Sequence, residues 1–416
     1  MRAAGHGRPS EVNVEHGGTG GGFPAHASWL ELSASALRHN VEMFRALEAA
    51  TGGGLRRMMG AVLKGNAYGH GFREMLPRVH PLVDVLYLIT PQDGLAVRAF
   101  EREHGLAPRQ VLVMGAIAPE EAVALAREGV DAVVADTSWR EAGPVLRAAR
   151  LERPLRVHVH IDTGLGREGF TLEQIPRETA FLAEHREEFE LVGALSHFSN
   201  TEDVTEQEYA LAQLEAFETG LHRLVTQLSP AKPPQRHIAA SAASLVLPRA
   251  RYDALRVGIS LYGLWPSPET RLSARLVLGE LPTLKPVLAW RCMSQVVKWL
   301  PAGSYVGYGC TYRCSEPTRI AVLPVGYFDG YPRLVSGKAH VLVNGRRCPV
   351  LGRVMMNHLI VDVTRATGDE RPVTATLLGH DGDETVSAEA VAGWAQTIHY
   401  ELVTRLGAHL KRVVVE

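Results

Sequence analysis

The spacing of apolar residues predicts alternating strands and helices over the first two thirds of the chain. From Pro119 to Arg127, for example, apolar residues recur at helical spacing after a proline in the first turn. Eight short apolar runs are typical of buried strands, namely Met58–Lys64, Val83–Thr90, Gln110–Gly115, Asp131–Asp136, Leu155–Asp162, Leu191–Ser199, Arg236–Ser241 and Leu255–Leu261. Eight strands joined by helices over about 210 residues indicate an α/β fold, a (β/α)8 barrel of the TIM type, with a doubly wound open sheet as the alternative.

After Leu281 the pattern changes to short β-like runs bounded by Gly, Pro or Asn, with a single helix predicted at 387–396 behind a serine cap. The runs are Lys285–Leu300, Tyr305–Tyr308, Arg319–Val325, Lys338–Val343, His358–Val363 and Val373–Leu378. Near the start of the chain, residues 29–32 alternate like a strand, and a serine-capped helix follows to about Ala50. We expect a barrel over residues 28–281 and a mostly β domain over 282–416, with residues 28–32 as a candidate strand of that β domain.

Composition argues against several classes of protein. The 416 residues carry a formal net charge of -1 with acidic and basic residues interleaved, so no nucleic-acid partner is expected. No apolar run is long enough to span a bilayer, and residues 1–27 are rich in Gly and His without a signal core, which predicts a disordered extension of a cytoplasmic protein. The cysteines are Cys292, Cys310, Cys314 and Cys348. Their spacing fits zinc poorly, so we expect free thiols and no metal site.

Lys64 stands at the carboxyl end of the first predicted barrel strand, directly before the Gly-rich residues 65–71. A lysine in a dry pocket tends to lose its proton, and the neutral amine is a nucleophile toward carbonyl groups. The alternative is a side chain that only extends past the strand end into water. The motif by itself leaves both interpretations open.

Other polar side chains follow the carboxyl ends of the predicted strands, where the active site of a parallel barrel lies. On the fifth strand His158, His160 and Asp162 alternate with aliphatic residues, which predicts a polar face toward the barrel interior. The next three strands carry His197, Ser199, His237, Ser241 and Arg256. A single buried histidine is usually a hydrogen-bonded core residue, but five strands marked in this way favour a functional site.

Seven motifs in this order resemble the alanine racemase family, over the chain from about Trp29 to its end. They are Ala61–Gly71, Asp162–Arg167, Arg256–Leu264, Val306–Gly309, Pro324–Gly330, Gly352–Asn357 and Thr397–Glu401. The resemblance implies a pyridoxal-phosphate enzyme, built from a barrel and a β domain, that interconverts L- and D-alanine and supplies D-alanine as a peptidoglycan precursor.

By this resemblance Lys64 anchors the cofactor covalently and, with Tyr308 of the β domain, forms a pair of acid–base groups on opposite faces of the substrate. A tyrosine acts as a base at neutral pH only with help from nearby hydrogen bonds or cations, which residues matching His197 and Arg256 supply in the family. Arg256 also matches the partner of the pyridine nitrogen. Because arginine hardly ever gives up a proton, that nitrogen stays unprotonated.

The remaining matches concern the phosphate, the substrate and a second subunit. The phosphate ligands would be Tyr68, Ser241, Tyr400 and the backbone amides of Gly258 and Ile259. Arg167 matches a residue that contacts the phenolic oxygen of the cofactor and orients the substrate carboxylate. Met356 would offer its amide to that carboxylate, and Tyr327 would line the entry corridor. Since Tyr308, Tyr327 and Met356 reach the partner barrel in this family, a homodimer with shared sites is implied.

Several positions depart from the family pattern. His160 stands where the family usually has a lysine, often carbamylated, that steadies the arginine, so we expect His160 itself or an anion to hold Arg167. Ala240, Val257 and Asn357 replace a usual Asn, Pro and Asp. These changes leave the substrate range open, and a racemase of serine or other amino acids is the nearest alternative. A fold-related pyridoxal-phosphate decarboxylase and a non-catalytic cofactor-binding barrel are disfavoured by the Gly-Tyr-Gly motif.

Overall fold

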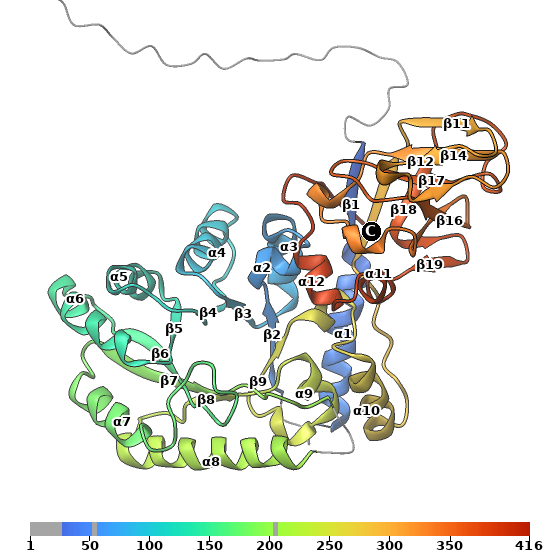
Figure 1. The fold of residues 1–416 in the computed structure, drawn as a ribbon. Coiled ribbons are helices and arrows are strands. Elements are labelled where there is room, and N and C mark those ends of the chain that lie inside the picture. The colour runs from blue at the N-terminus through green and yellow to red at the C-terminus, as the bar shows by residue number, and fades with distance from the viewer. Residues whose placement is uncertain (1–26, 52–55, 203–206) are drawn as a thin grey trace, which may run out of the picture.

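The computed structural model describes residues 27–51, 56–202 and 207–416, which form a barrel and a β domain (Figure 1). The disordered extension predicted for residues 1–27 lies outside the described residues, apart from Ala27, and stays a prediction. Among the described helices, none combines the length and apolar character needed to cross a membrane.

Eight parallel strands form the barrel. They are β2 (Met58–Val62), β3 (Val85–Leu88), β4 (Gln110–Val113), β5 (Asp131–Val134), β6 (Leu155–His160), β7 (Phe189–Leu195), β8 (Gln235–His237) and β9 (Ala254–Val257). Neighbours in the chain are neighbours in the sheet from β2 to β8, and β9 pairs with β2. A single bridge between Ala240 and Arg256, with the Arg256 amide donating to Ala239 O at 2.9 Å, joins β8 to β9. The barrel is therefore nearly closed, and the carboxyl ends of its strands share one rim.

Helices follow most of the barrel strands and cover its outer face (Figure 1). The barrel helices are α1 (Ala34–Thr51), α2 (Lys64–Tyr68), α3 (Phe72–Val79), α4 (Pro91–Glu103), α5 (Pro119–Glu128), α6 (Ala142–Ala149), α7 (Ile175–Glu184), α8 (Glu208–Leu228), α9 (Ser241–Val246) and α10 (Pro268–Leu278). Short 3-10 helices lie at η1 (His80–Leu82), η2 (Thr137–Glu141), η3 (Pro248–Ala250) and η4 (Ile259–Tyr262). Ser33 caps α1 by accepting from the Ala36 amide at 3.1 Å.

The β domain is built on a ten-stranded sheet, with β19 paired to the side of β18. Its strands are β1 (Ser28–Ser33), β10 (Leu288–Met293), β11 (Val296–Leu300), β14 (Thr318–Leu323), β15 (His340–Val343), β16 (Arg346–Leu351), β17 (Leu359–Asp362), β18 (Thr374–Asp381), β19 (Glu384–Val386) and β20 (Lys411–Val415). A separate hairpin pairs β12 (Tyr305–Val306) with β13 (Tyr312–Arg313). β1 lies between β10 and β20, so the chain enters the β domain before it builds the barrel.

Five short helices complete the β domain, namely η5 (Tyr308–Cys310), η6 (Tyr327–Asp329), η7 (Arg333–Val335), α11 (Ala388–Trp394) and α12 (His399–Thr404). Ser387 caps α11 by accepting from the Ala390 amide at 3.1 Å. α12 packs against α2 of the barrel, which brings Tyr400 within 6.3 Å of Tyr68, measured between ring centroids. All four cysteines are free thiols.

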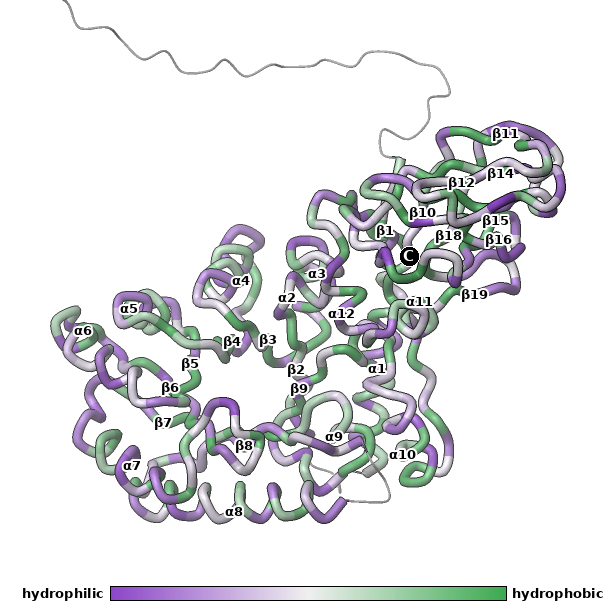
Figure 2. The backbone as a smooth tube through the Cα atoms, in the orientation of Figure 1, coloured by the Kyte–Doolittle hydropathy of each residue, from purple (hydrophilic) through white to green (hydrophobic). Residues whose placement is uncertain are grey.

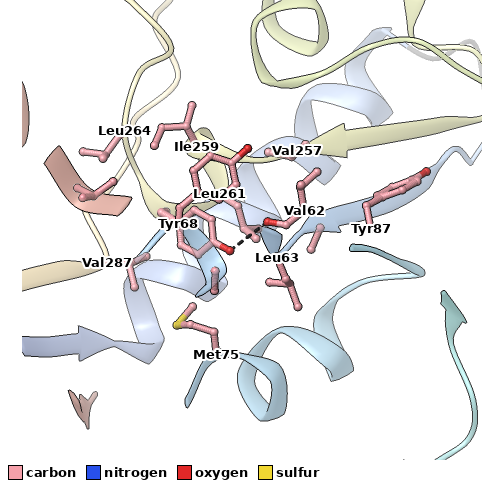
Figure 3. Packing of buried hydrophobic residues seen from close by; sticks show 14 of the residues in the cluster. Val62, Leu63, Tyr68, Met75, Tyr87, Val257, Ile259, Leu261, Leu264 and Val287 are labelled. Atoms are coloured by element: carbon pink, nitrogen blue, oxygen red, sulfur yellow. Dashed lines mark hydrogen bonds between the residues drawn. The ribbon is translucent and has the colours of Figure 1, made fainter. Parts of the chain in front are cut away.

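The apolar core runs from the barrel interior into the β domain as one cluster. Figure 2 shows hydrophobic segments along the barrel strands and hydrophilic segments on the outer turns. Around the end of β2, Val62 and Leu63 pack with Tyr68 and Val257 (Figure 3). The Tyr262 hydroxyl donates to Val62 O at 3.1 Å. This packing fixes the backbone that presents Lys64.

All eight predicted barrel strands are present, and most of them end earlier than the apolar runs. His197 and Ser199, for instance, follow β7 in a loop, because the parallel ladder stops at Leu195. The predicted run Lys285–Leu300 was wrong as one element and is two strands, β10 and β11. Four strands, β13, β16, β19 and β20, were not predicted.

Gly60→Ala is expected to lower the free energy of unfolding by about 1–3 kcal/mol, because small-to-large changes overpack a dense core. A Cβ at position 60 would lie 2.1 Å from Tyr87 Cε2 and 2.4 Å from Leu255 O. Urea-induced unfolding of the full chain measures the change. Gly368→Ala is the control, because no atom lies within 4 Å of its Cβ. A similar loss in both variants would contradict this packing account.

Candidate active site

Lys64 is the first residue of a tight turn that directly follows β2. From Gly65 to Tyr68 every φ is positive, between 52° and 62°, so α2 is one turn of left-handed helix. Non-glycine residues adopt this conformation at a cost of about 1–2 kcal/mol each. The turn is held by the Ala67 amide, which donates to Leu63 O at 2.9 Å, and by the Arg412 guanidinium, which donates to Gly69 O at 2.8 Å. Such enforced strain is typical of functional sites.

Lys64 lines an open cavity of about 250 Å³ at the carboxyl-terminal rim of the barrel. The cavity wall contains all nine residues predicted to bind the cofactor, namely Lys64, Tyr68, Arg167, His197, Ser241, Arg256, Gly258, Ile259 and Tyr400. These residues come from six separate segments of the barrel and from α12 of the β domain. The barrel rim therefore collects most of the predicted site in one place.

Arg256 forms the polar floor of this cavity and is only 4% exposed. Its Nη2 donates to Ser196 O at 2.6 Å and lies 3.1 Å from His197 Nδ1. Its Nη1 donates to His237 O and lies 3.1 Å from His237 Nδ1. Because a guanidinium has only donors, both imidazoles accept through Nδ1 and keep their hydrogen on Nε2.

Burial and like charge depress the pKa values of the basic groups around the floor. Burial, helped by the Arg256 charge, lowers the pKa of His197 to about 3 and that of His160 to about 4. Burial lowers the pKa of Arg256 to about 10, so the guanidinium stays charged at neutral pH. The pKa of the Lys64 amine is lowered by loss of solvent and then by the charges of Arg167 and Arg256, although part of the side chain remains exposed.

A small polar cradle lies on the far side of the cavity, around Gly258. A Cβ at position 258 would lie 2.4 Å from Tyr68 Oη, so only glycine leaves this space open. Ser241 Oγ accepts from the Gly258 amide at 3.0 Å. The amide of Ile259 has no intrahelical partner, because it begins η4. Burial raises the pKa of the Tyr68 phenol and of Tyr400, so both hydroxyls remain donors.

Arg167 is held by its neighbour Glu168, which sequence reasoning missed. Arg167 Nη2 donates to Glu168 Oε1 at 2.6 Å, and Nε donates to Oε2. His160 is 4% exposed and lines the same cavity, but makes no hydrogen bond to Arg167 within the described residues. The expectation that His160 itself holds Arg167 therefore finds no contact to support it, and the expectation of a bound anion stays a prediction. The sequence feature that could have predicted this pair was the carboxylate next to the arginine, because a guanidinium pairs well with two carboxylate oxygens.

Three predicted site residues lie outside the cavity. Tyr308, Tyr327 and Met356 are on the β domain, and their exposed fractions are 72%, 44% and 55%. The Tyr327 amide donates to Met355 O at 3.0 Å, and the next amide donates to Met356 O at the same distance. Phe328 is exposed on the same domain as well, and we call these four exposed side chains the exposed group. A single chain does not bring this group to Lys64.

Asp162 has a structural role in the loop that leads to Arg167. Asp162, predicted on the polar face of β6, instead accepts from the Gly164 amide at 3.0 Å and the Gly166 amide at 3.2 Å, so it shapes the turn before Arg167.

Within the described ranges, no group of three or more His, Cys, Asp or Glu side chains is arranged to hold a metal ion.

The charges next to Lys64 predict opposite effects of two substitutions on its pKa. Arg167→Gln removes a positive charge that lowers the pKa of Lys64, so this pKa should rise. Glu168→Gln removes a negative charge that raises it, so the pKa should fall. The rate at which an amine reagent such as trinitrobenzenesulfonate labels Lys64, followed against pH by peptide mass mapping, measures both shifts. Shifts of the same sign would contradict the charge arrangement.

Comparison with known proteins gives the same family over nearly the whole chain. The family model described as alanine racemase, N-terminal domain, matches residues 32–266, and the model for the alanine racemase C-terminal domain matches residues 287–414. Alanine racemase of Leptospira interrogans (serovar Lai) is 33% identical over 407 residues, which cover 94% of this chain and 96% of that protein. That of Symbiobacterium thermophilum is 35% identical over 392 residues, covering 92% and 96%.

Solved structures agree with this assignment. Alanine racemase from a D-cycloserine-producing Streptomyces lavendulae superposes with a TM-score of 0.81 at 31% identity, covering 95% of this chain and 98% of that one. The Bacillus anthracis alanine racemase with bound L-Ala-P gives a TM-score of 0.81 at 28% identity, covering 95% and 96%. One explanation accounts for the two matched domains, the near-complete coverage and the predicted site residues that meet at the barrel rim. The chain belongs to the alanine racemase family.

Proposed function

We propose that this protein interconverts L- and D-alanine with pyridoxal 5'-phosphate as its cofactor, using Lys64 and Tyr308 as acid–base groups. The observation that carries the proposal is the Lys64 amine, whose lowered pKa and place in the cavity suit both covalent attachment and proton transfer. As a member of the alanine racemase family, the protein would act in the cytoplasm and supply D-alanine for peptidoglycan.

The cavity fits this cofactor. The cradle around Gly258 offers the phosphate two tyrosine hydroxyls, from Tyr68 and Tyr400, that have no hydrogen-bond partner within the described residues. Ser241 and the unpaired Ile259 amide add further donors. Lys64 would hold the aldehyde carbon, Arg256 the ring nitrogen and Arg167 the phenolic oxygen. Both guanidinium groups also carry charge of the sign that an anionic cofactor requires.

When bound, the cofactor supplies an electron-withdrawing ring that stabilises negative charge at the substrate α-carbon. Lys64 Nζ, whose pKa is lowered by burial and by the charges of Arg167 and Arg256, takes or returns the α-proton on one face. Tyr308 serves the other face. His197 keeps a hydrogen on Nε2 that can donate to the phenolic oxygen of Tyr308 in the assembled site. Arg167 orients the substrate carboxylate through its guanidinium, while Glu168 limits its rotation.

The second acid–base group must come from another copy of the chain. Tyr308 is 72% exposed and lies outside the cavity that Lys64 lines, together with Tyr327 and Met356. An exposed apolar group of this kind is typical of a subunit interface. We infer a homodimer in which each β domain completes the barrel site of its partner.

Mixing two inactive variants tests this shared site. Lys64→Ala and Tyr308→Phe should each lack racemase activity alone, because each removes one acid–base group from every site. After dissociation and reassociation, mixed dimers contain one intact site, so activity should return to about a quarter of wild type. The matched control mixes the wild type with a chain that carries both substitutions. Failure of the variants to complement each other, under conditions where subunits exchange, would contradict a site shared between chains.

Substrate and reaction are tested together by incubating the protein and cofactor with a panel of L-amino acids in heavy water. L-Alanine should yield D-alanine with deuterium at the α-carbon, because the proton is exchanged with solvent during inversion. Chiral chromatography with mass spectrometry measures both. Faster inversion of serine or of a basic amino acid would show that this amino acid, and not alanine, is the preferred substrate. Release of carbon dioxide would indicate decarboxylation instead of racemisation.

A further inference from the structure

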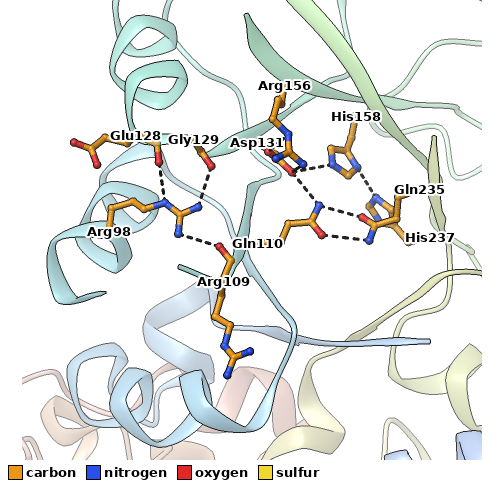
Figure 4. A network of polar contacts seen from close by, with 10 residues as sticks. All are labelled: Arg98, Arg109, Gln110, Glu128, Gly129, Asp131, Arg156, His158, Gln235 and His237. Carbon is orange, nitrogen blue, oxygen red and sulfur yellow. Dashed lines mark hydrogen bonds and ion pairs between the residues drawn. The ribbon is translucent and has the colours of Figure 1, made fainter. Parts of the chain in front are cut away.

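A line of buried polar side chains runs from Arg256, under the cavity, to the opposite end of the barrel (Figure 4 shows its members His237, His158 and Asp131). Arg256 Nη1 lies 3.1 Å from His237 Nδ1, and His237 Nε2 lies 2.8 Å from His158 Nδ1. His158 Nε2 lies 3.3 Å from Asp131 Oδ2. We call these four residues the relay. Asp131 begins β5, so the relay spans the barrel from rim to base.

Each hydrogen bond in the relay has only one allowed direction. Arg256 can only donate, so His237 accepts through Nδ1 and carries its hydrogen on Nε2. His237 then donates to His158, which must accept through Nδ1 and donate from Nε2. Asp131, as a carboxylate, only accepts. If either imidazole were reversed, two N–H donors would face each other. The guanidinium of Arg256 is the end of the relay that faces the cavity.

The relay also links a buried cation to a buried anion. Arg256 is 4% exposed and Asp131 is 1% exposed, and no carboxylate is ion-paired to Arg256 within the described residues. A buried charge is costly unless it is paired or fully hydrogen-bonded. Gln110 and the half-exposed Arg156 also contact Asp131, at 2.9 Å and 3.1 Å. Two neutral imidazoles thus connect the two charges.

The barrel backbone makes room for this arrangement. His158 is paired in register with Gly193 on β7, next to a bulge in the β6–β7 ladder. A Cβ at position 193 would lie 1.9 Å from His158 Nδ1. Any residue larger than glycine at position 193 of β7 would push the imidazole of His158 away from His237. The position of the His158 ring is therefore built into two strands.

We propose that His158 and Asp131 are positioning residues for the reaction, which fix the tautomer of His237 and through it the orientation of Arg256 toward the cavity. This inference deepens the proposed function and rests on it. The correctly held guanidinium presents its second amino group, Nη2, to His197. In that orientation His197 keeps its Nε2 hydrogen available to the group that exchanges the α-proton.

Neutron crystallography of the wild-type protein, exchanged into deuterium oxide, tests the direction of the relay. Deuterium should be found on Nε2 of both His237 and His158 and on neither Nδ1. Deuterium on Nδ1 of His237 would overturn the proposal. This experiment does not depend on turnover, so it decides the relay even if the protein proves not to racemise alanine, a result that would reject only the proposed function.

His158→Phe and the matched variant His80→Phe test the consequence for the reaction. His80 is buried like His158 and lies 2.9 Å from the Glu101 carboxylate. It is on η1, however, and not on a strand of the barrel. His158→Phe removes the acceptor of His237, and kcat for alanine should fall on the order of tenfold while KM stays near wild type. His80→Phe should lower the urea midpoint and leave kcat unchanged. Equal losses of kcat in the two folded variants would overturn the proposal.

Asp131→Asn provides a smaller change should His158→Phe not fold. The carboxamide removes the negative charge at the end of the relay with almost no change in volume. It should also lower kcat with little change in KM, and by less than His158→Phe. An unchanged kcat together with a reversed His237 tautomer would overturn the link between the relay and catalysis.

Discussion

The enclosure of positive charge beneath the barrel rim is the constraint on which the site depends. Arg256 is buried in the cavity floor, and burial, together with the charge of Arg256, lowers the pKa of His160, His197 and the Lys64 amine. A lysine that would be protonated in water is thereby moved toward its nucleophilic form. The same charge obliges the neighbouring imidazoles to accept through Nδ1. The proposed cofactor attachment and proton transfer, and the relay, therefore share one guanidinium that has no direct carboxylate partner within the described residues.

The fold supplies this charge arrangement with rigid supports. Lys64 is presented by a left-handed turn that packs against α12 of the β domain, which also carries Tyr400 into the cavity. β1 lies within the sheet of the β domain and leads directly into α1 of the barrel. The barrel and the β domain are therefore linked directly from β1 to α1, and both contribute to the wall of the site. In the proposed homodimer, the exposed group around Tyr308 would meet a second copy of the chain.

Much of this arrangement could be predicted from the sequence, because barrel strands are long apolar runs and their ends carry unusual polar residues. The eight strands, the serine caps of α1 and α11, and the cavity residues Lys64, His197, Ser241 and Arg256 were of this kind. The other predicted cavity residues, namely Tyr68, Arg167, Gly258, Ile259 and Tyr400, came from the resemblance to the family. β13 has two residues and β19 three, which is too short for a periodic signal, and β16 is interrupted by arginines and a proline. Glu168 was missed because a charged loop residue is usually solvated. The relay depends on contacts between strands that no local pattern encodes.

The central claim is that the Lys64 amine, activated by its charged surroundings, is the covalent anchor of the cofactor. Reduction with borohydride after addition of pyridoxal phosphate, followed by proteolysis and mass spectrometry, tests it most directly. The protein should be yellow before reduction, and one peptide, containing Lys64, should carry the reduced cofactor. Attachment at another lysine such as Lys285, or a colourless protein with no labelled peptide, would contradict the account.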